Sequence, residues 1–251
     1  MELGLAGKVA LVTGGGRDVG GHIARLLAAE GAKVAVNYRN SEAEAAALVD
    51  EITAAGGVAR AWKADISDYD DVTAMMDDVV ADWGSMDILV NNAGLVKYQR
   101  FVESSPEDWK PQMDVCLYGA LNCSHAAARH MVEQKSGRII NIVGDSSRIG
   151  EANISIAATA RGGTIALGKS MAKELGRYNI TVNTIALGLV ETAHQDPEFL
   201  AKHMDRILKA YPLKRIGKPE DVSPMVVFLS SQGAGWITGQ VISVNGGFSM
   251  V

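Results

Sequence analysis

Residues 9–20 read VALVTGGGRDVG, an apolar run that passes through three consecutive glycines into a helical pattern. Glycines let the backbone turn sharply and come close to a phosphate group, and the first N–H groups and dipole of a helix attract anions. A glycine-rich turn alone is a weak indication. Its position between the first apolar run and the first helical stretch makes a dinucleotide-binding turn the favoured interpretation.

Beyond this turn, short apolar runs alternate with longer helical stretches. Val/Ile/Leu runs of this length are typical of strands that are covered on both faces. We expect strands at 9–13, 34–38, 58–64, 88–91, 138–143, 181–186 and 241–244. We expect helices at 19–30, 42–55, 69–83, 113–134, 155–177 and 219–229. The alternation predicts an α/β fold, a single Rossmann-type doubly wound parallel sheet of about seven strands with helices on both faces.

The composition favours one soluble domain over residues 1–251, since no linker, charge block or repeat divides the chain. The formal net charge of −5 offers no basic surface for nucleic acid. Cys116 and Cys123 form neither a disulfide framework nor a metal-ligand spacing, so we expect no metal. The chain shows no secretion signal and no apolar stretch of about 18 residues, and we expect a cytoplasmic protein without a membrane span.

Residues 188–212 interrupt the alternation with a long, weakly amphipathic segment after the sixth expected strand. In an open α/β sheet, ligands bind beyond the carboxyl ends of the strands. We interpret this segment as a substrate lid, with a surface helical hairpin as the plainer alternative.

Motifs spread along the whole chain resemble those of the short-chain dehydrogenase/reductase family. The turn at 13–20 has that family's form Thr-Gly-x-x-x-Gly-x-Gly, except that Asp18 replaces the middle glycine. Further matches are Asp65, the Asn-Asn-Ala-Gly of 91–94, residues 183–188 with Thr192, and the tail 237–247. We expect Asp18 to turn away from the pyrophosphate and to cap a helix that starts at Val19.

The resemblance implies a nicotinamide dinucleotide cofactor. The residues that would contact it are Gly14, Gly16, Arg17, Asp18, Val19, Gly20, Arg39, Asp65, Ile66, Asn91, Ala93, Gly94, Arg161, Gly188, Val190 and Thr192. NAD-preferring enzymes of this fold place an acid at the end of the second strand, where this chain has Asn-Tyr-Arg-Asn at 37–40. Arg17 and Arg39 are suited to a 2′-phosphate, so NADP(H) is favoured over NAD(H), although both arginines also fit an ordinary surface role.

The family's proton-transfer residues are a tyrosine, a lysine four residues later, a serine about thirteen residues earlier and an asparagine on the preceding helix. By register, those positions hold Ala157, Arg161, Gly144 and Cys116. Hydride addition to a ketone leaves an alkoxide that needs a proton, and general-acid assistance contributes about 10²–10⁴ in rate. The sequence therefore predicts an active site that departs from the family mechanism.

Substitute groups follow the fifth expected strand. Asp145 is the first candidate acid or base, with loop hydrogen bonding or helix capping as an equal alternative. Ser146 and Ser147 are candidates for the place of the missing serine, and Arg161 is suited to the nicotinamide ribose or to an anionic substrate. Tyr98, Tyr211 and His194 are weaker catalytic candidates from loops that overhang the site, and Cys116 is expected to pack as a small apolar side chain.

Three functions stay open. The first is an atypical NADP(H)-dependent reductase of a small organic substrate, with imine or iminium reduction as its most coherent chemistry, because a protonated C=N bond needs no acid. The second is a non-redox cyclase, dehydratase or isomerase, and the third is a dinucleotide-binding pseudoenzyme. The resemblance also implies a homo-oligomer, a dimer or tetramer, paired through the helices at 113–134 and 155–177.

Overall fold

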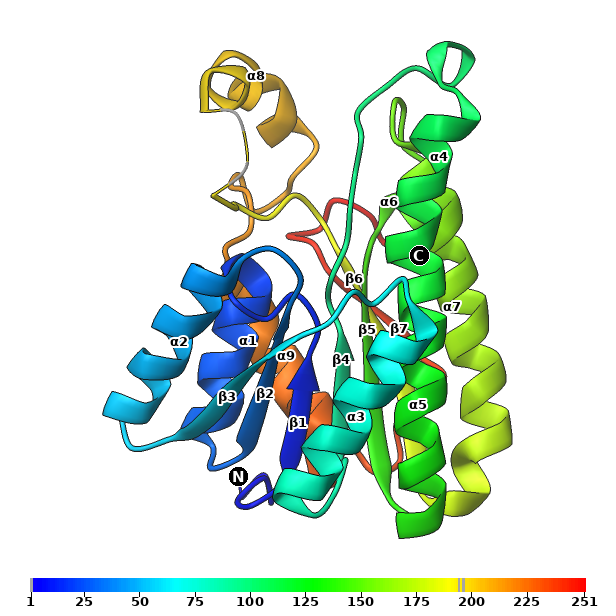
Figure 1. Cartoon of the computed structure of the whole chain (residues 1–251). Helices are drawn as coiled ribbons and strands as arrows, with labels where there is room; N and C mark the ends of the chain where they lie inside the picture. Colours follow the sequence, from blue (N-terminus) through cyan, green and yellow to red (C-terminus); the bar gives the residue numbers. More distant parts are fainter. Residues whose placement is uncertain (1, 194, 196) are drawn as a thin grey trace.

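The computed structural model describes residues 2–193, 195 and 197–251, which build a seven-stranded parallel sheet (Figure 1). The strands are β1 (Val9–Val12), β2 (Lys33–Tyr38), β3 (Val58–Lys63), β4 (Ile88–Asn91), β5 (Gly137–Gly144), β6 (Ile180–Leu187) and β7 (Val241–Val244). Their order across the sheet is β3-β2-β1-β4-β5-β6-β7. The order reverses between β1 and β4, which is where sheets of this kind bind ligands.

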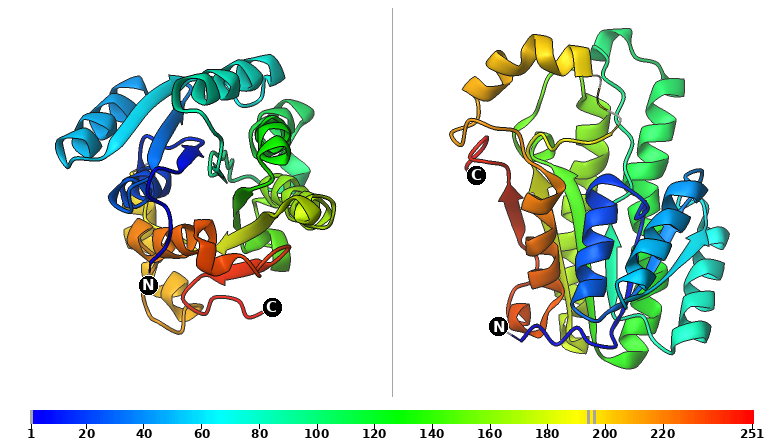
Figure 2. Two further views of the ribbon diagram at one scale, coloured as in Figure 1. Left: turned by 90° about the horizontal axis from the view of Figure 1, so that it is seen from below. Right: turned by 90° about the vertical axis from the view of Figure 1, so that its left-hand side faces the viewer.

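Helices cover both faces of the sheet, as expected (Figure 2). One face carries α1 (Asp18–Ala29), α2 (Glu42–Ala54) and α9 (Pro219–Ser230), and the other carries α3 (Tyr69–Trp83), α5 (Gly119–Gln134) and α7 (Ser155–Leu175). Successive side chains of β1 feed the two apolar clusters in turn, with Ala10 and Val12 in the first and Val9 and Leu11 in the second. This two-sided burial is why the strands read as unbroken apolar runs. Among the helices of the described residues, none is long and apolar enough to cross a bilayer.

The helix expected at 113–134 begins earlier than the sequence analysis placed it. It starts as α4 (Pro106–Met113), passes through a π-helical turn (Asp114–Tyr118) and continues as α5. The start is fixed by Ser105, whose backbone N–H donates to the Asp108 carboxylate at 3.1 Å, and by proline at the first helical position. Because of this extension, α4 rises beyond the carboxyl ends of the strands.

Two further helices lie at the carboxyl end of the sheet. The short α6 (Ser146–Ile149) directly follows β5. Helix α8 (Pro197–Lys209) occupies the segment after β6 and stands beyond the strand ends in both Figure 1 and the right-hand view of Figure 2. The site is therefore bordered by α4 and α8, and the lid function of residues 188–212 stays a prediction.

Candidate functional site

The glycine turn is held at the switch point by contacts with β4. Thr13 Oγ1 accepts hydrogen bonds from the backbone N–H groups of Asn92 (2.9 Å) and Ala93 (3.0 Å). Gly14 has a left-handed backbone, with φ +58°. A Cβ on Gly20 would lie 2.4 Å from the Gly14 carbonyl oxygen and 2.5 Å from Asn92 Nδ2. Only glycine permits this approach, which aims the start of α1 at the space above β1 and β4.

Asp18 does not cap a helix that starts at Val19. It is itself the first residue of α1, the N-cap position belongs to Arg17, and the Asp18 side chain makes no capping bond. Its φ is +50°, a conformation that glycine adopts without strain, which explains the glycine that the family has here. The carboxylate instead accepts a hydrogen bond of 2.8 Å from the backbone N–H of Ala193. Asp18 thus ties the glycine turn to the segment after β6.

The end of β2 carries one cation, Arg39, and no acid, and Arg17 in the glycine turn is a second cation. Arg39 Nη1 lies 3.2 Å from Asp65 Oδ2, and Arg17 Nη1 lies 3.5 Å from Glu44 Oε1. The Arg39 side chain is 53% exposed, so it is open to a ligand despite its ion pair. Burial raises the pKa of Asp65, but hydrogen bonds from Ser67 and the nearby Arg39 outweigh it and hold that pKa below its usual range. Asp65 is therefore a fixed anion beside this edge.

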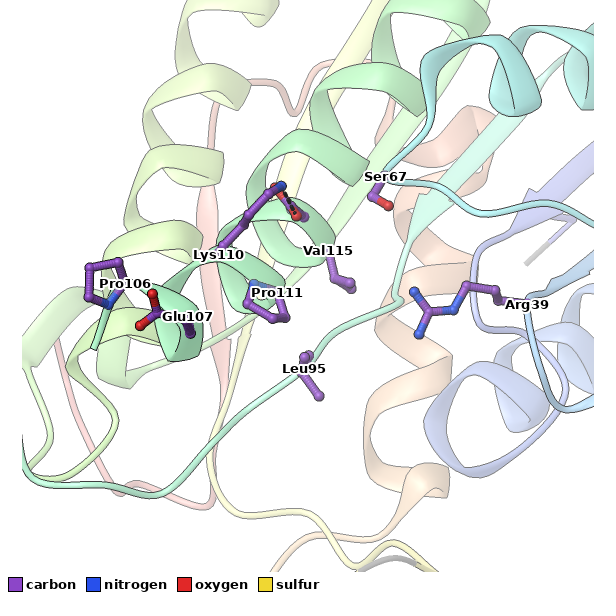
Figure 3. A pocket seen from close by; sticks show the side chains of 9 residues that line it. Arg39, Ser67, Leu95, Pro106, Glu107, Lys110, Pro111 and Val115 are labelled. Carbon is purple, nitrogen blue, oxygen red and sulfur yellow. Dashed lines mark hydrogen bonds and ion pairs between the residues drawn. The ribbon is translucent and has the colours of Figure 1, made fainter. Parts of the chain in front are cut away.

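A cavity of about 400 Å³ opens between Arg39 and helix α4 (Figure 3). Its lining residues are Arg39, Ser67, Leu95, Pro106, Glu107, Lys110, Pro111, Asp114 and Val115. In Figure 3 the Arg39 guanidinium reaches from one wall toward Leu95 and Val115 on the other. The apolar side chains Leu95 and Val115 opposite the Arg39 cation suit a flat aromatic base that bears an anion, while the charged residues Glu107, Lys110 and Asp114 line the α4 side.

Several other residues that were predicted to contact the cofactor have side chains or Cα atoms that pack against, or hydrogen-bond to, neighbouring parts of the protein. Gly16 faces α2, and Val19 is buried beneath the turn. Ile66 is buried against Gly119. The Asn91 side chain does not face the adenosine side, because its Nδ2 donates to buried Ser124 and Asn141 within the sheet.

The segment after β6 is anchored by Tyr211. The Tyr211 hydroxyl accepts a hydrogen bond of 2.6 Å from the Leu189 N–H, and its ring packs on Gly188 and stacks on Phe248. Burial raises the pKa of Tyr211, and only the Leu189 N–H opposes this. Tyr211 is 4% exposed and its hydroxyl group is engaged by the Leu189 N–H, which describes an anchoring role, and the catalytic role of Tyr211 stays a prediction. The predicted candidate His194 lies outside the described residues.

Two predicted contacts of the same segment are placed next to this anchor. Val190 is buried and forms a parallel bridge with Gly217. Thr192 donates its backbone N–H to Gln195 Oε1 at 3.2 Å, which leaves its hydroxyl group uncommitted among the described residues.

Arg161 dominates the opposite end of the site. A Cβ added to Gly94 would lie 2.7 Å from Arg161 Nη2, and a Cβ added to Gly144 would lie 3.7 Å from Arg161 Nη1. The guanidinium therefore spans the ends of β4 and β5. One turn earlier on α7, Ala157 is fully buried. Within the part of the chain that the structure describes, Arg161 has neither an acidic partner nor a hydrogen bond. A partly buried guanidinium without a counter-charge is costly, and this one is open to an anion.

Asp145 is not an open acid or base. Its carboxylate is fully buried and accepts hydrogen bonds from Ser243 Oγ (2.8 Å) and Asn245 Nδ2 (2.5 Å), and Arg148 Nη1 lies 3.8 Å away. These partners come from the C-terminal segment and α6. Loop hydrogen bonding or helix capping was the predicted alternative to an acid or base role. The Asp145 side chain makes loop hydrogen bonds and no capping bond.

The two serines after Asp145 differ. Ser147 Oγ donates to the Gly144 carbonyl at 2.6 Å and is thereby part of the loop. Ser146 Oγ lies 3.0 Å from where a Cβ on Gly144 would be, so this hydroxyl group stands beside the position that the family gives to serine. Cys116 is buried, and its Sγ also lies 3.3 Å from both the backbone N and the backbone O of Leu95.

Two polar side chains at the mouth of this site complete the electrostatics. Tyr98 is 66% exposed, and burial of its hydroxyl group and the charge of Glu151 raise its pKa, while Arg161 opposes the rise. Burial also raises the pKa of Glu151. The sequence analysis missed Glu151, although it is the one acid besides Asp145 between β5 and α7.

Comparisons with known proteins agree with this architecture. A family model described as Enoyl-(Acyl carrier protein) reductase matches residues 15–249. The 3-oxoacyl-[acyl-carrier-protein] reductase FabG of Staphylococcus aureus is 41% identical over 247 residues, which cover 97% of this chain and 98% of the relative. The 3-oxoacyl-[acyl-carrier-protein] reductase of Synechocystis is 38% identical over 98% of both chains. A Sinorhizobium meliloti structure, described provisionally as a short-chain alcohol dehydrogenase, superposes with a TM-score of 0.92 at 32% identity over 97% of this chain and 96% of that one.

Proposed function

The chain belongs to the short-chain dehydrogenase/reductase family of oxidoreductases, and we propose that it is an NADP(H)-dependent reductase that acts on carbon–nitrogen double bonds. The proposal rests on what α7 presents to the site. Where the family mechanism needs a phenol and an ammonium, this helix carries the buried methyl group of Ala157 and the guanidinium of Arg161.

This pair supplies no proton. Alanine has none to give, and a guanidinium keeps its protons at ordinary pH. A ketone would become an alkoxide without an acid beside it, at a cost of about 10²–10⁴ in rate. A protonated imine carries its proton with it, so hydride addition removes charge and leaves a neutral amine. Reduction of C=N therefore demands least from the residues present.

The residues fit NADP(H), which when bound would supply the hydride. The Gly20 contacts aim the start of α1 at the pyrophosphate position, and the cavity beside Arg39 suits adenine with a 2′-phosphate. The end of β2 lacks the acid that would favour NAD(H). Arg161 would lie nearest the nicotinamide ribose, since it spans Gly94 and Gly144.

A second candidate is reduction of a 3-oxoacyl carbonyl with Tyr98 as the acid. Two observations favour it. The phenol of Tyr98 is under the influence of the Arg161 charge, and the two reductases compared above are named for 3-oxoacyl substrates. Tyr98 lies on the segment between β4 and α4 and would have to act from the mouth of the site.

A direct comparison of substrates separates the two candidates. Oxidation of NADPH is followed with 2-methyl-1-pyrroline and with an acetoacetyl thioester, in the wild type and in Tyr98→Phe. We expect turnover of the imine, little turnover of the thioester, and an imine rate in Tyr98→Phe within about threefold of the wild type. Thioester turnover that Tyr98→Phe abolishes, with the imine inert, would establish the second candidate. NADPH binding without turnover of either substrate would favour the non-redox or pseudoenzyme alternatives.

The cofactor preference is tested at Arg39. In Arg39→Ala we expect KM for NADPH to rise about tenfold or more, with KM for NADH little changed, because an exposed charge-assisted contact to phosphate is lost. Arg60→Ala, which removes an exposed, ion-paired arginine from β3 (62% exposed against 53% for Arg39), is the matched control. Equal effects of Arg39→Ala on both cofactors would contradict a 2′-phosphate contact.

A further inference from the structure

The Arg161 guanidinium lacks an anion. Within the described residues it makes no ion pair, although it is partly buried and lies between the ends of β4 and β5. The other arginines of the site are satisfied: Arg17 and Arg39 face acids, and Arg148 lies beside Asp145 and donates to Ser243. Arg161 stands out because its cost of burial is not offset by the protein.

The proposed reaction increases the need for a negative charge beside Arg161, because its substrate is a cation. An iminium carbon next to an uncompensated guanidinium would meet repulsion, which a low-dielectric site strengthens. Asp145 does not offset it, because its carboxylate is already engaged by Ser243, Asn245 and Arg148. Glu151, on the loop between α6 and α7, influences the pKa of Tyr98, as Arg161 also does, but within the described residues it forms no ion pair with Arg161. The missing negative charge must come from the ligand.

We infer that the substrate carries a carboxylate next to its C=N bond, and that Arg161 binds this carboxylate. The inference rests on the proposed function and names its substrate class, α-imino carboxylates, whose reduction gives α-amino acids with a substituted nitrogen. The guanidinium fork matches a carboxylate in a bidentate arrangement, which a lysine ammonium does not. Ser146 Oγ, beside Gly144, is placed to donate a further hydrogen bond to the same group.

The reaction balances without an acid on α7. The substrate carbon gains the hydride that the reduced nicotinamide supplies and forms a C–H bond. The π pair of C=N becomes the lone pair of nitrogen, and the proton already on nitrogen stays there. One positive charge is lost from the substrate, while the ion pair between its carboxylate and Arg161 persists, so the product leaves as an amino acid.

Paired substrates test the inference. NADPH oxidation is measured with Δ1-piperideine-2-carboxylate and with Δ1-piperideine, which differ only in the carboxylate, in the wild type, Arg161→Met, Arg161→Lys and the control Arg60→Met. Binding of pipecolate and of piperidine to the NADP⁺-bound protein is measured by calorimetry, and circular dichroism checks that each variant is folded. The wild type is expected to favour the carboxylated imine by about 100-fold in kcat/KM. That preference should fall below about tenfold in Arg161→Met and stay intact in Arg60→Met, with Arg161→Lys in between.

Failure of this inference differs from failure of the proposed function. Equal kcat/KM for the two imines, or a preference that survives Arg161→Met, would overturn the inference and leave C=N reduction standing. If neither imine is reduced, the proposed function fails, and pipecolate binding that requires Arg161 still supports the carboxylate site. A higher KM for NADPH in Arg161→Met with the substrate preference unchanged would assign the guanidinium to the cofactor and overturn the inference.

Discussion

The glycine turn depends on close contacts at Gly20 that leave no room for a side chain. The carbonyl oxygen of Gly14 and Nδ2 of Asn92 approach Gly20 so closely that a methyl group has no room there. One residue later, at Gly21, a methyl group would make only ordinary van der Waals contacts, with Arg25 Nη1 at 3.4 Å and with the Gly16 backbone at 3.5 and 3.6 Å. Adjacent glycines on one helix are therefore under opposite constraints.

We expect Gly20→Ala to weaken NADPH binding at least tenfold and to destabilise the fold by about 1–3 kcal/mol, because the backbone of the turn must move. Gly21→Ala should instead be neutral or stabilising by up to about 1 kcal/mol, since alanine is the better helix former. Thermal unfolding and fluorescence titration with NADPH measure both effects. Similar stability and affinity in the two variants would show that the turn tolerates the contact.

The start of helix α9 is fixed by the carboxylate of Asp221. Arg215 holds Asp221 through two hydrogen bonds of 2.6 and 2.7 Å, and the Lys218 N–H donates to the same carboxylate at 2.8 Å. Hydrogen bonding from Arg215 outweighs the opposing effect of burial and lowers the pKa of Asp221 from 3.8 to about 2. The carboxylate thus fixes both the loop before α9 and the first turn of the helix.

We expect Asp221→Asn to lower the free energy of unfolding at pH 7 by about 0.5–1 kcal/mol, a small value because both side chains are about a third exposed or more and solvent screens them. The folded pKa lies below the unfolded one, so this stabilisation is complete above about pH 5 and is lost as the pH falls from 3.8 through about 2. Urea unfolding at pH 7, 4 and 3 measures the difference. A difference that does not shrink toward pH 3, or one matched by the α2 surface control Asp50→Asn, would exclude this ion pair as the cause.

Most elements could be predicted from the sequence because burial leaves a local mark. Burial on both faces explains why β1, β2 and β4–β6 are apolar runs, and the glycine-rich turn indicated where α1 starts. The destinations of individual side chains depend on distant partners instead. Asp145 is engaged by Ser243 and Asn245, which are 98 and 100 residues away, and no local pattern encodes such a contact. The sequence placed Arg161 at the position of the family's lysine, but it could not show that Arg161 has no ion-pair partner among the described residues.

At the scale of the whole molecule, α5 and its preceding π-helical turn leave apolar side chains uncovered. Tyr118 is 53% exposed and Leu121 is 37% exposed. Isolated exposed apolar residues are ordinary, but these two lie one turn apart. The family resemblance implies two-fold pairing through α5 and α7, the helices to which this face belongs. In a two-fold interface each side chain is buried twice, at about 1.5–3 kcal/mol for each full burial.

We therefore expect the 26.6 kDa chain to run as a dimer or tetramer in size-exclusion chromatography with light scattering at micromolar concentration. Leu121→Glu should shift it to the monomer mass, because the substitution removes two apolar contacts and places like charges across the two-fold axis. Val58→Glu is the matched control, since Val58 is a similarly exposed aliphatic residue on β3, at the edge of the sheet. A wild-type monomer, or an oligomer that Leu121→Glu leaves intact, would show that the α5 and α7 face is not the interface. Circular dichroism of each variant separates dissociation from unfolding.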